Sequence, residues 1–145
     1  MTEPASTNEV TARWTGEKRF LCTSARGPGL IIDAVDGGAG MKPTEALLAA
    51  LGTCAAVDVV EILRKKRMIL DSYRVELTGQ RAATPPRRYE RVTVKHVVKA
   101  AGLTESALEQ AVKLSTEKYC SVAATLNAEL VSEWEVEVLA VDGEY

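Results

Sequence analysis

Aromatic residues are scarce in this sequence, where they make up 5% of 145 residues, although 46% of the residues are hydrophobic. A core built from this composition must consist mostly of Ala, Val, Leu and Ile side chains. The length suits one folding unit rather than two. We therefore expect a single domain over residues 1–145, with the polar residues 1–8 frayed.

An excess of charge of one sign is also lacking, because 20 acidic residues oppose 18 basic residues and the net charge is −2. A nucleic-acid-binding protein usually carries a basic patch. The one basic cluster here, residues 64–67, is explained by its position at the C-terminus of a predicted helix, where the helix dipole favours cations. The sequence therefore predicts no nucleic-acid partner.

The N-terminal residues lack the basic and apolar regions of a secretory leader, which predicts a cytoplasmic protein with reduced thiols. Cysteine is sparse as well. Cys22, Cys54 and Cys120 are odd in number, and their spacing does not match the paired ligands of a zinc site. We expect neither a disulfide framework nor a metal site from these three residues.

Against this background, residues 42–67 stand out as one long helix around which the rest of the chain is organised. Pro43 and Glu45 mark its start, and the basic cluster marks its end. No residue between 46 and 57 is charged, so the helix is apolar on every side and must be enclosed by protein. The uncharged run is shorter than the roughly 18 residues that a membrane span needs, so we expect no membrane partner.

Alternating apolar and polar residues predict strands on both sides of this helix. Three short strands near residues 10–14, 20–22 and 30–32 precede the helix, and two longer strands near residues 73–77 and 92–98 follow it. Thr104 then caps a second helix, whose inward stripe runs to Tyr119. A last strand has Trp134, Val136 and Val138 on its inner face. The fold class is therefore α+β, with antiparallel sheets wrapped around long buried central helices.

A single sheet cannot cover a helix that is apolar all round. Small residues such as Ala49, Gly52 and Ala56 would let another backbone approach this helix closely. A homodimer would bury the helix from both sides, and we expect one.

Two cysteines are candidates for chemistry. A cysteine in an apolar helix is most often a small hydrophobe, so Cys54 needs a second feature to count as functional. Cys120 supplies it, because it lies at the end of the second helix and outside a clean apolar stripe. The two cysteines are 120 − 54 = 66 residues apart, so only the fold could bring them together. Cys22 shares a strand face with Phe20 and is interpreted as structural.

Two other polar residues stand on apolar surfaces. Asp58 follows Cys54 by one helical turn and must find a partner or take up a proton. It either orients a cation at an active site or bonds to a hydroxyl or amide across the dimer. His96, the only histidine, is interpreted as a satisfied sheet residue rather than a catalytic base.

The segments PTEALLAALGTCAAVDVV and EKYCSVAATL resemble the two cysteine motifs of the OsmC/Ohr family of thiol-dependent peroxidases. The resemblance runs from the N-terminal strands to the last strand, and it implies an intertwined homodimer with active sites at the subunit interface. It also implies that Cys54 attacks an organic hydroperoxide and that Cys120 resolves the sulfenic acid as a disulfide. An external dithiol would then reduce this disulfide, and the chemistry needs neither a metal nor a bound cofactor.

The sequence departs from this resemblance at the residues expected to activate the cysteine. The family places a glutamate ten residues before the reactive cysteine, where it holds an arginine, whereas here Thr44 has that position and Glu45 follows it. Nine residues along a helix put two side chains about 180° apart, so Glu45 is interpreted as a first-turn residue that matches the helix dipole. The arginine has no unique match among Arg13, Arg19 and Arg26.

Three functions are therefore open. The first is an organic hydroperoxide reductase that uses Cys54 and Cys120. The second is a non-redox protein that keeps the fold and binds a small molecule. The third is a thioesterase, because a long helix wrapped by antiparallel sheet also describes the hot-dog architecture, and this third function gives Cys120 no role.

Overall fold

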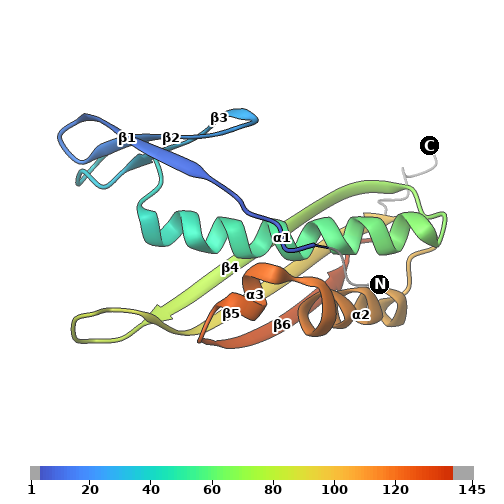
Figure 1. Cartoon of the computed structure of the whole chain (residues 1–145). Helices are drawn as coiled ribbons and strands as arrows, with labels where there is room; N and C mark the ends of the chain where they lie inside the picture. Colours follow the sequence, from blue (N-terminus) through green and yellow to red (C-terminus); the bar gives the residue numbers. More distant parts are fainter. Residues whose placement is uncertain (1–3, 139–145) are drawn as a thin grey trace, which may run out of the picture. The chain divides into compact units, whose positions relative to one another are not determined.

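The computed structural model describes residues 4–138, and Figure 1 shows its helices and strands in chain order. The chain divides into two compact units, one ending at Leu47 and the other beginning at Leu48. Residues 4–8 form neither helix nor strand, and the rest of the segment that we expect to be frayed, residues 1–3, lies outside the described residues. The assignment of residues 1–145 to one domain stays a prediction.

The first unit contains an antiparallel meander of β1 (Val10–Gly16), β2 (Arg19–Ser24) and β3 (Gly27–Asp33). The turn between β1 and β2 uses Gly16 at a φ of 123°, a conformation that side chains disfavour. β3 begins at Gly27, three residues before the predicted start. The reason is that Gly27, at a φ of 116°, pairs directly with Ser24 and closes the turn at once. The predicted three-stranded meander is confirmed.

The long helix α1 (Pro43–Lys65) begins in the first unit and continues through the second. It is followed by β4 (Leu70–Arg81) and β5 (Tyr89–Ala100), which form the predicted antiparallel pair. Next come α2 (Glu105–Leu114), a π-helical turn (Ser115–Tyr119), α3 (Ser121–Thr125) and β6 (Glu129–Val136).

The expectation that the sheets are antiparallel throughout is wrong for the last strand. β6 lies beside β5 and runs parallel to it, with His96 opposite Trp134 in the register. The chain leaves the end of β5, returns along the sheet through α2 and α3, and so enters β6 in the same direction as β5. The second sheet, of order β4-β5-β6, is therefore mixed.

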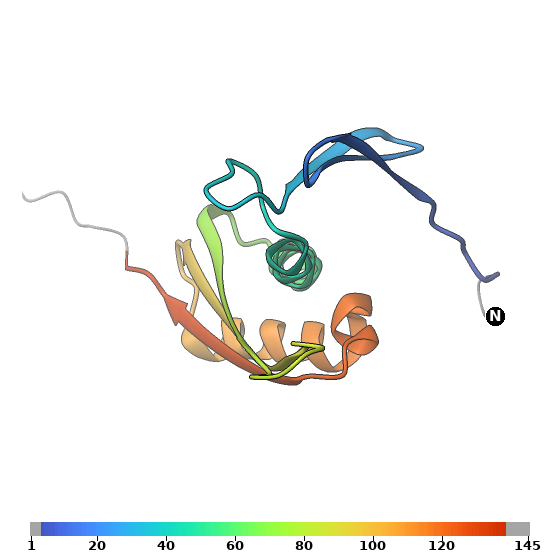
Figure 2. The same cartoon turned by 90° about the vertical axis from the view of Figure 1, so that its left-hand side faces the viewer.

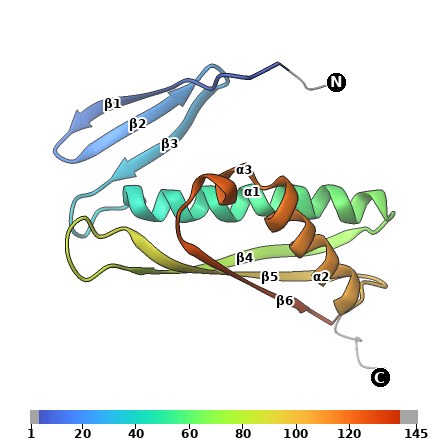
Figure 3. The same ribbon diagram turned by 60° about the horizontal axis from the view of Figure 1, so that its bottom comes forward.

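The helices of the second unit cover one face of this sheet, as Figures 2 and 3 show for α1, α2 and α3. The buried side chains on this face come from every second residue of β5, which confirms the predicted alternation. The helices contribute the following buried residues: Leu51, Ala55, Val59 and Leu63 from α1, and Leu108, Ala111 and Val112 from α2. They form two clusters along the sheet, one around Val59 and one around Leu51.

The other face of the sheet is mostly charged, although Val97 lies buried on it at 1% exposed. Ion pairs cross it from strand to strand, including Lys95 to Glu135 at 3.0 Å, Lys99 to Asp71 at 3.4 Å and Arg74 to Glu137 at 3.6 Å. The side chains involved are mostly exposed, so each pair contributes little to stability, but together they keep this face in solvent.

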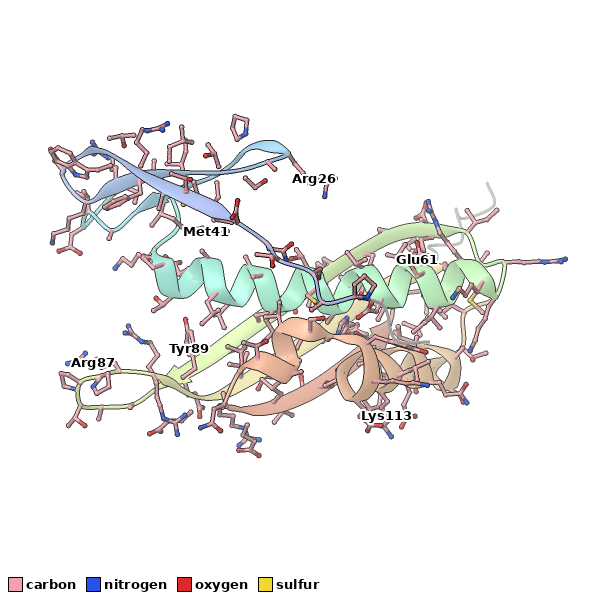
Figure 4. All side chains as sticks on the ribbon, viewed as in Figure 1. Arg26, Met41, Glu61, Arg87, Tyr89 and Lys113 are labelled. Carbon is pink, nitrogen blue, oxygen red and sulfur yellow. The ribbon has the colours of Figure 1, made fainter. Side chains whose placement is uncertain are left out.

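The second helix begins as predicted, with the Thr104 hydroxyl accepting a hydrogen bond from the Ala107 N–H at 3.1 Å. Its outer face carries the ion pair between Lys113 and Glu109 at 2.6 Å, and Figure 4 shows Lys113 projecting on the side away from α1. The same ammonium group lies 5.7 Å from the centroid of the Trp134 ring.

The end of this helix differs from the prediction. In the π turn, the Cys120 N–H donates to the Ser115 carbonyl, five residues earlier, at 2.8 Å. The extra residue rotates the following side chains, so that Cys120 is 3% exposed whereas Tyr119, which we predicted on the inward stripe, is 51% exposed. Val138, predicted to face inward, is also exposed, because β6 ends at Val136.

α1 buries only one of its faces within the second unit, although it is apolar all round. Val57 is 62% exposed on the opposite face. The helix is also long and apolar enough to cross a membrane, with a mean hydropathy of 2.0 over its most apolar 18 residues. Because Leu51, Val59 and Leu63 pack into the core against the sheet, we interpret it as the core helix of this fold.

Candidate active site

The fold brings Cys54 and Cys120 together. Cys54 lies half-buried near the middle of α1, and Cys120 lies buried where the π turn passes into α3. Cys54 packs against the core cluster that contains Cys120, and it lies close enough to raise the pKa of the Cys120 thiol. A joint function of the two cysteines requires that the fold bring them together, and it does.

The surroundings of Cys120 favour its neutral thiol. Burial raises the pKa of Cys120 most, and the nearby Cys54 side chain and the charge of Asp58 raise it further. The Ala123 N–H, 3.4 Å from the sulfur, acts in the opposite direction and lowers the pKa. The balance is a raised pKa, so Cys120 holds its proton at neutral pH.

The Asp58 carboxylate accepts a hydrogen bond from the hydroxyl of Ser115. The Ser115 Oγ lies 3.1 Å from the Asp58 Oδ2 and 3.1 Å from the Ala55 carbonyl oxygen. Ser115 is fully buried at the start of the π turn. Of the two roles left open for Asp58, the structure shows the hydrogen bond to a hydroxyl, which comes from the same chain and not from across a dimer.

A pocket of about 480 Å³ borders Asp58. The following residues, from the end of α1 and from the π turn with the residue before it, line this pocket: Asp58, Glu61, Ile62, Lys65, Lys66, Leu114 and Tyr119. Figure 4 labels Glu61 on α1, three residues after Asp58. The pocket combines apolar side chains with four charged ones.

Glu45 performs the first-turn role that its spacing predicts. Its Oε1 accepts a hydrogen bond from the Lys42 N–H at 3.0 Å, which satisfies a backbone donor at the start of α1. The carboxylate is thus part of the helix N-terminus.

The three candidate arginines all belong to the first unit. Arg19 donates to the Asp33 Oδ2 at 3.2 Å. The Val35 N–H and this arginine together lower the pKa of Asp33. Arg13 lies on β1, and Arg26 lies in the turn between β2 and β3.

His96 is buried in the sheet, but it is only half satisfied. The Tyr73 Oη lies 2.6 Å from the His96 Nδ1, while the Nε2 has no hydrogen-bond partner among the residues that the structure describes. Burial lowers the pKa of His96 to about 4, so the ring is neutral at pH 7. The prediction of a sheet residue is confirmed, and the prediction that it is fully satisfied is wrong.

Sequence reasoning missed one residue of the site. Ser115 belongs to the inward stripe predicted for the second helix, and no role was predicted for its hydroxyl. A buried hydroxyl needs a partner, and Asp58 was predicted to need a hydroxyl or an amide, so the two could have been paired. Within residues 4–138, no group of three His, Cys, Asp or Glu side chains gathers in a way that could hold a metal ion.

Comparisons with known proteins agree with this architecture. The sequence model of a family described as OsmC-like protein matches residues 36–135. Protein YhfA of Escherichia coli (strain K12) is 35% identical over 132 residues, which cover 91% of this chain and 98% of YhfA.

Solved structures extend the comparison. A hypothetical protein from Aquifex aeolicus VF5 has a TM-score of 0.83 and 37% identity, covering 93% of this chain and 99% of that protein. The organic hydroperoxide resistance protein OhrB of Bacillus subtilis has a TM-score of 0.59 and 19% identity, covering 91% of this chain and 98% of OhrB. The second likeness shows a shared fold.

Proposed function

The chain belongs to the OsmC-like protein family, and from this premise we propose that it is a thiol peroxidase that reduces organic hydroperoxides through Cys54 and Cys120. One observation supports the proposal most. Two cysteines that are remote in the sequence pack in one part of the core, between the long helix and a π turn, in a fold shared with a hydroperoxide resistance protein.

The proposed reaction has two oxidative steps. The Cys54 thiolate attacks the outer peroxide oxygen, the O–O bond breaks, and the alcohol leaves with a proton while Cys54 becomes a sulfenic acid. The Cys120 sulfur then attacks the Cys54 sulfur, the S–O bond breaks, and water leaves as the disulfide forms. An external dithiol takes the disulfide back to two thiols, so no bound cofactor is required.

The different surroundings of the two cysteines support this division of roles. Cys54 is partly exposed, as a residue that meets a substrate must be. Cys120 is 3% exposed and keeps its proton, which suits a sulfur that reacts only with a neighbouring residue.

Thiol counting tests the proposal directly. Reduced protein treated with a small excess of cumene hydroperoxide is expected to lose two free thiols per chain and to gain a disulfide between Cys54 and Cys120. Peptide mapping should show Cys22 still free. A wild-type protein that keeps all three thiols would contradict the peroxidase function.

We also propose a homodimer in which the exposed apolar face of α1 is covered by a second copy. Val57, at 62% exposed, lies on a helix face without charged residues for about three turns. Sedimentation at micromolar concentration is expected to give twice the chain mass of 15.6 kDa. A folded monomer at that concentration would contradict the homodimer, because the apolar face of α1 would then be exposed to water without a second copy. We propose a cytoplasmic location for this homodimer.

A small-molecule-binding function is the second candidate, and the pocket beside Asp58 favours it. Lys65 and Lys66 could bind an anionic group there without any turnover of the cysteines. The thiol experiment separates the two functions, because a binding protein loses no thiols. The thioesterase hypothesis depended on a hot-dog architecture. The chain belongs to the OsmC-like family instead, so we do not propose a thioesterase.

A further inference from the structure

We propose that Asp58 carries the proton of the disulfide-forming step, an inference that rests on the proposed peroxidase function. The step needs such a group, because the attacking sulfur must lose a proton and the departing hydroxide must gain one. A carboxylate in the same part of the site as both cysteines can perform both transfers.

The position of Asp58 meets this requirement. It follows Cys54 by four residues on α1, so the two side chains share one face of the helix. Its negative charge also contributes to the raised pKa of Cys120, which places the carboxylate in the neighbourhood of that thiol. Ser115 in the π turn connects Asp58 to Cys120. Its hydroxyl contacts the Asp58 carboxylate, and its carbonyl accepts a hydrogen bond from the Cys120 N–H.

The hydrogen bonds of Ser115 fit both protonation states of Asp58. The Ser115 hydroxyl has one proton and two neighbouring acceptors, each at 3.1 Å. When Asp58 is ionised, the hydroxyl donates to its carboxylate. When Asp58 is protonated, its own O–H donates to the Ser115 oxygen, and the Ser115 proton goes to the Ala55 carbonyl. The site therefore accepts a proton without leaving a buried polar group unpaired.

The chemistry balances with this one carrier. The Asp58 carboxylate takes the proton of the Cys120 thiol as the thiolate attacks the sulfenic sulfur of Cys54. The S–S bond forms and the S–O bond breaks, and the hydroxide that leaves takes the proton back from Asp58 as water. Cys120 is oxidised, the sulfenic sulfur is reduced, and Asp58 ends the step ionised.

The pocket provides a way to test this role chemically. Its wall includes Asp58, and its volume of about 480 Å³ admits a small carboxylate from solution. Formate added to an Asp58→Ala variant can occupy the space of the missing side chain and take over the proton transfer. A purely structural carboxylate would not be replaced in this way.

The experiment measures the two oxidative steps separately. Sulfenic acid formation is followed by dimedone labelling in a Cys120→Ser background, and disulfide closure is followed by loss of the second thiol. In Asp58→Asn we expect the rate of disulfide closure to fall about 100-fold, which is a typical contribution of a positioned acid or base to a rate. Sulfenic acid should still form in this variant. Asp58→Glu should restore most of the closure rate. Glu117→Gln, an exposed acid in the same π turn, should close like the wild type.

Formate is expected to accelerate closure in Asp58→Ala at least tenfold, with acetate less effective because it is larger. Normal closure in Asp58→Asn would overturn the role of Asp58 and leave the peroxidase function standing. Slow closure that formate cannot restore, in a variant whose circular dichroism matches the wild type, would also overturn it. If no sulfenic acid forms in Cys120→Ser, both this role and the peroxidase function fail.

Discussion

Replacing Cys54 by serine is expected to abolish hydroperoxide consumption, whereas replacing Cys120 by serine leaves one turnover per chain. The serine hydroxyl at position 54 is not ionised at neutral pH and cannot attack the peroxide oxygen as a thiolate does. Without Cys120 the attack still occurs, but the sulfenic acid has no neighbouring sulfur with which to condense. Peroxide consumption under single-turnover conditions and dimedone labelling measure the two outcomes.

Cys22→Ser is the matched control for both variants. Cys22 lies on β2 in the first unit and is half-buried, so its replacement should leave both the rate and the number of thiols lost per turnover unchanged. Equal rates of thiol loss in Cys54→Ser and wild-type protein would mean that another cysteine reacts first, and the division of roles would be wrong.

The free energy of unfolding is expected to fall by about 3 kcal/mol as the pH decreases from about 6.5 to about 4, because of His96. In the unfolded chain this residue takes up a proton near its ordinary pKa of 6.5, whereas burial lowers the pKa of the folded residue to about 4. Between these values the unfolded state binds more protons, so stability is full above pH 6.5 and is lost as the pH falls. The magnitude follows from 1.36 kcal/mol per pH unit.

Urea denaturation at a series of pH values measures this loss. His96 is the only histidine in the sequence, so a His96→Gln variant is a direct control. The variant should be less stable at pH 7, because the Tyr73 hydroxyl loses its ring partner, but its stability should change much less between pH 6.5 and 5. An unchanged slope in the variant would assign the effect to carboxylates instead.

The sequence predicted those parts of the fold that depend on local patterns. Alternation around Tyr73 identified β4, and alternation around Val94 identified β5. The hydroxyl of Thr104 identified the start of α2. The direction of β6 was missed, because the alternation around Trp134 is the same in parallel and antiparallel strands, and the helix predicted before it was not used as a crossover connection. Direction is set by the path of the chain after β5.

The sequence predicted which two cysteines form the site, but not the π turn that turns Cys120 into the core. Helical periodicity places Tyr119 inward, and one extra residue in the π turn replaces it with Cys120. No residue in STEKY marks such a turn, since all five are compatible with an α-helix. The turn is held by tertiary contacts, above all those of the Ser115 hydroxyl with α1.

The charged outer face of the second sheet has a consequence for aggregation. β4 and β6 are the edge strands of this sheet, and exposed strand edges tend to pair with other chains. Glu133 and Glu135 on β6, and Arg74 and Glu76 on β4, place charges along both edges, so another strand would meet like charges or a desolvation cost. The homodimer that we propose through the apolar face of α1 would leave these charged edges of the second sheet in solvent, where they oppose fibre formation.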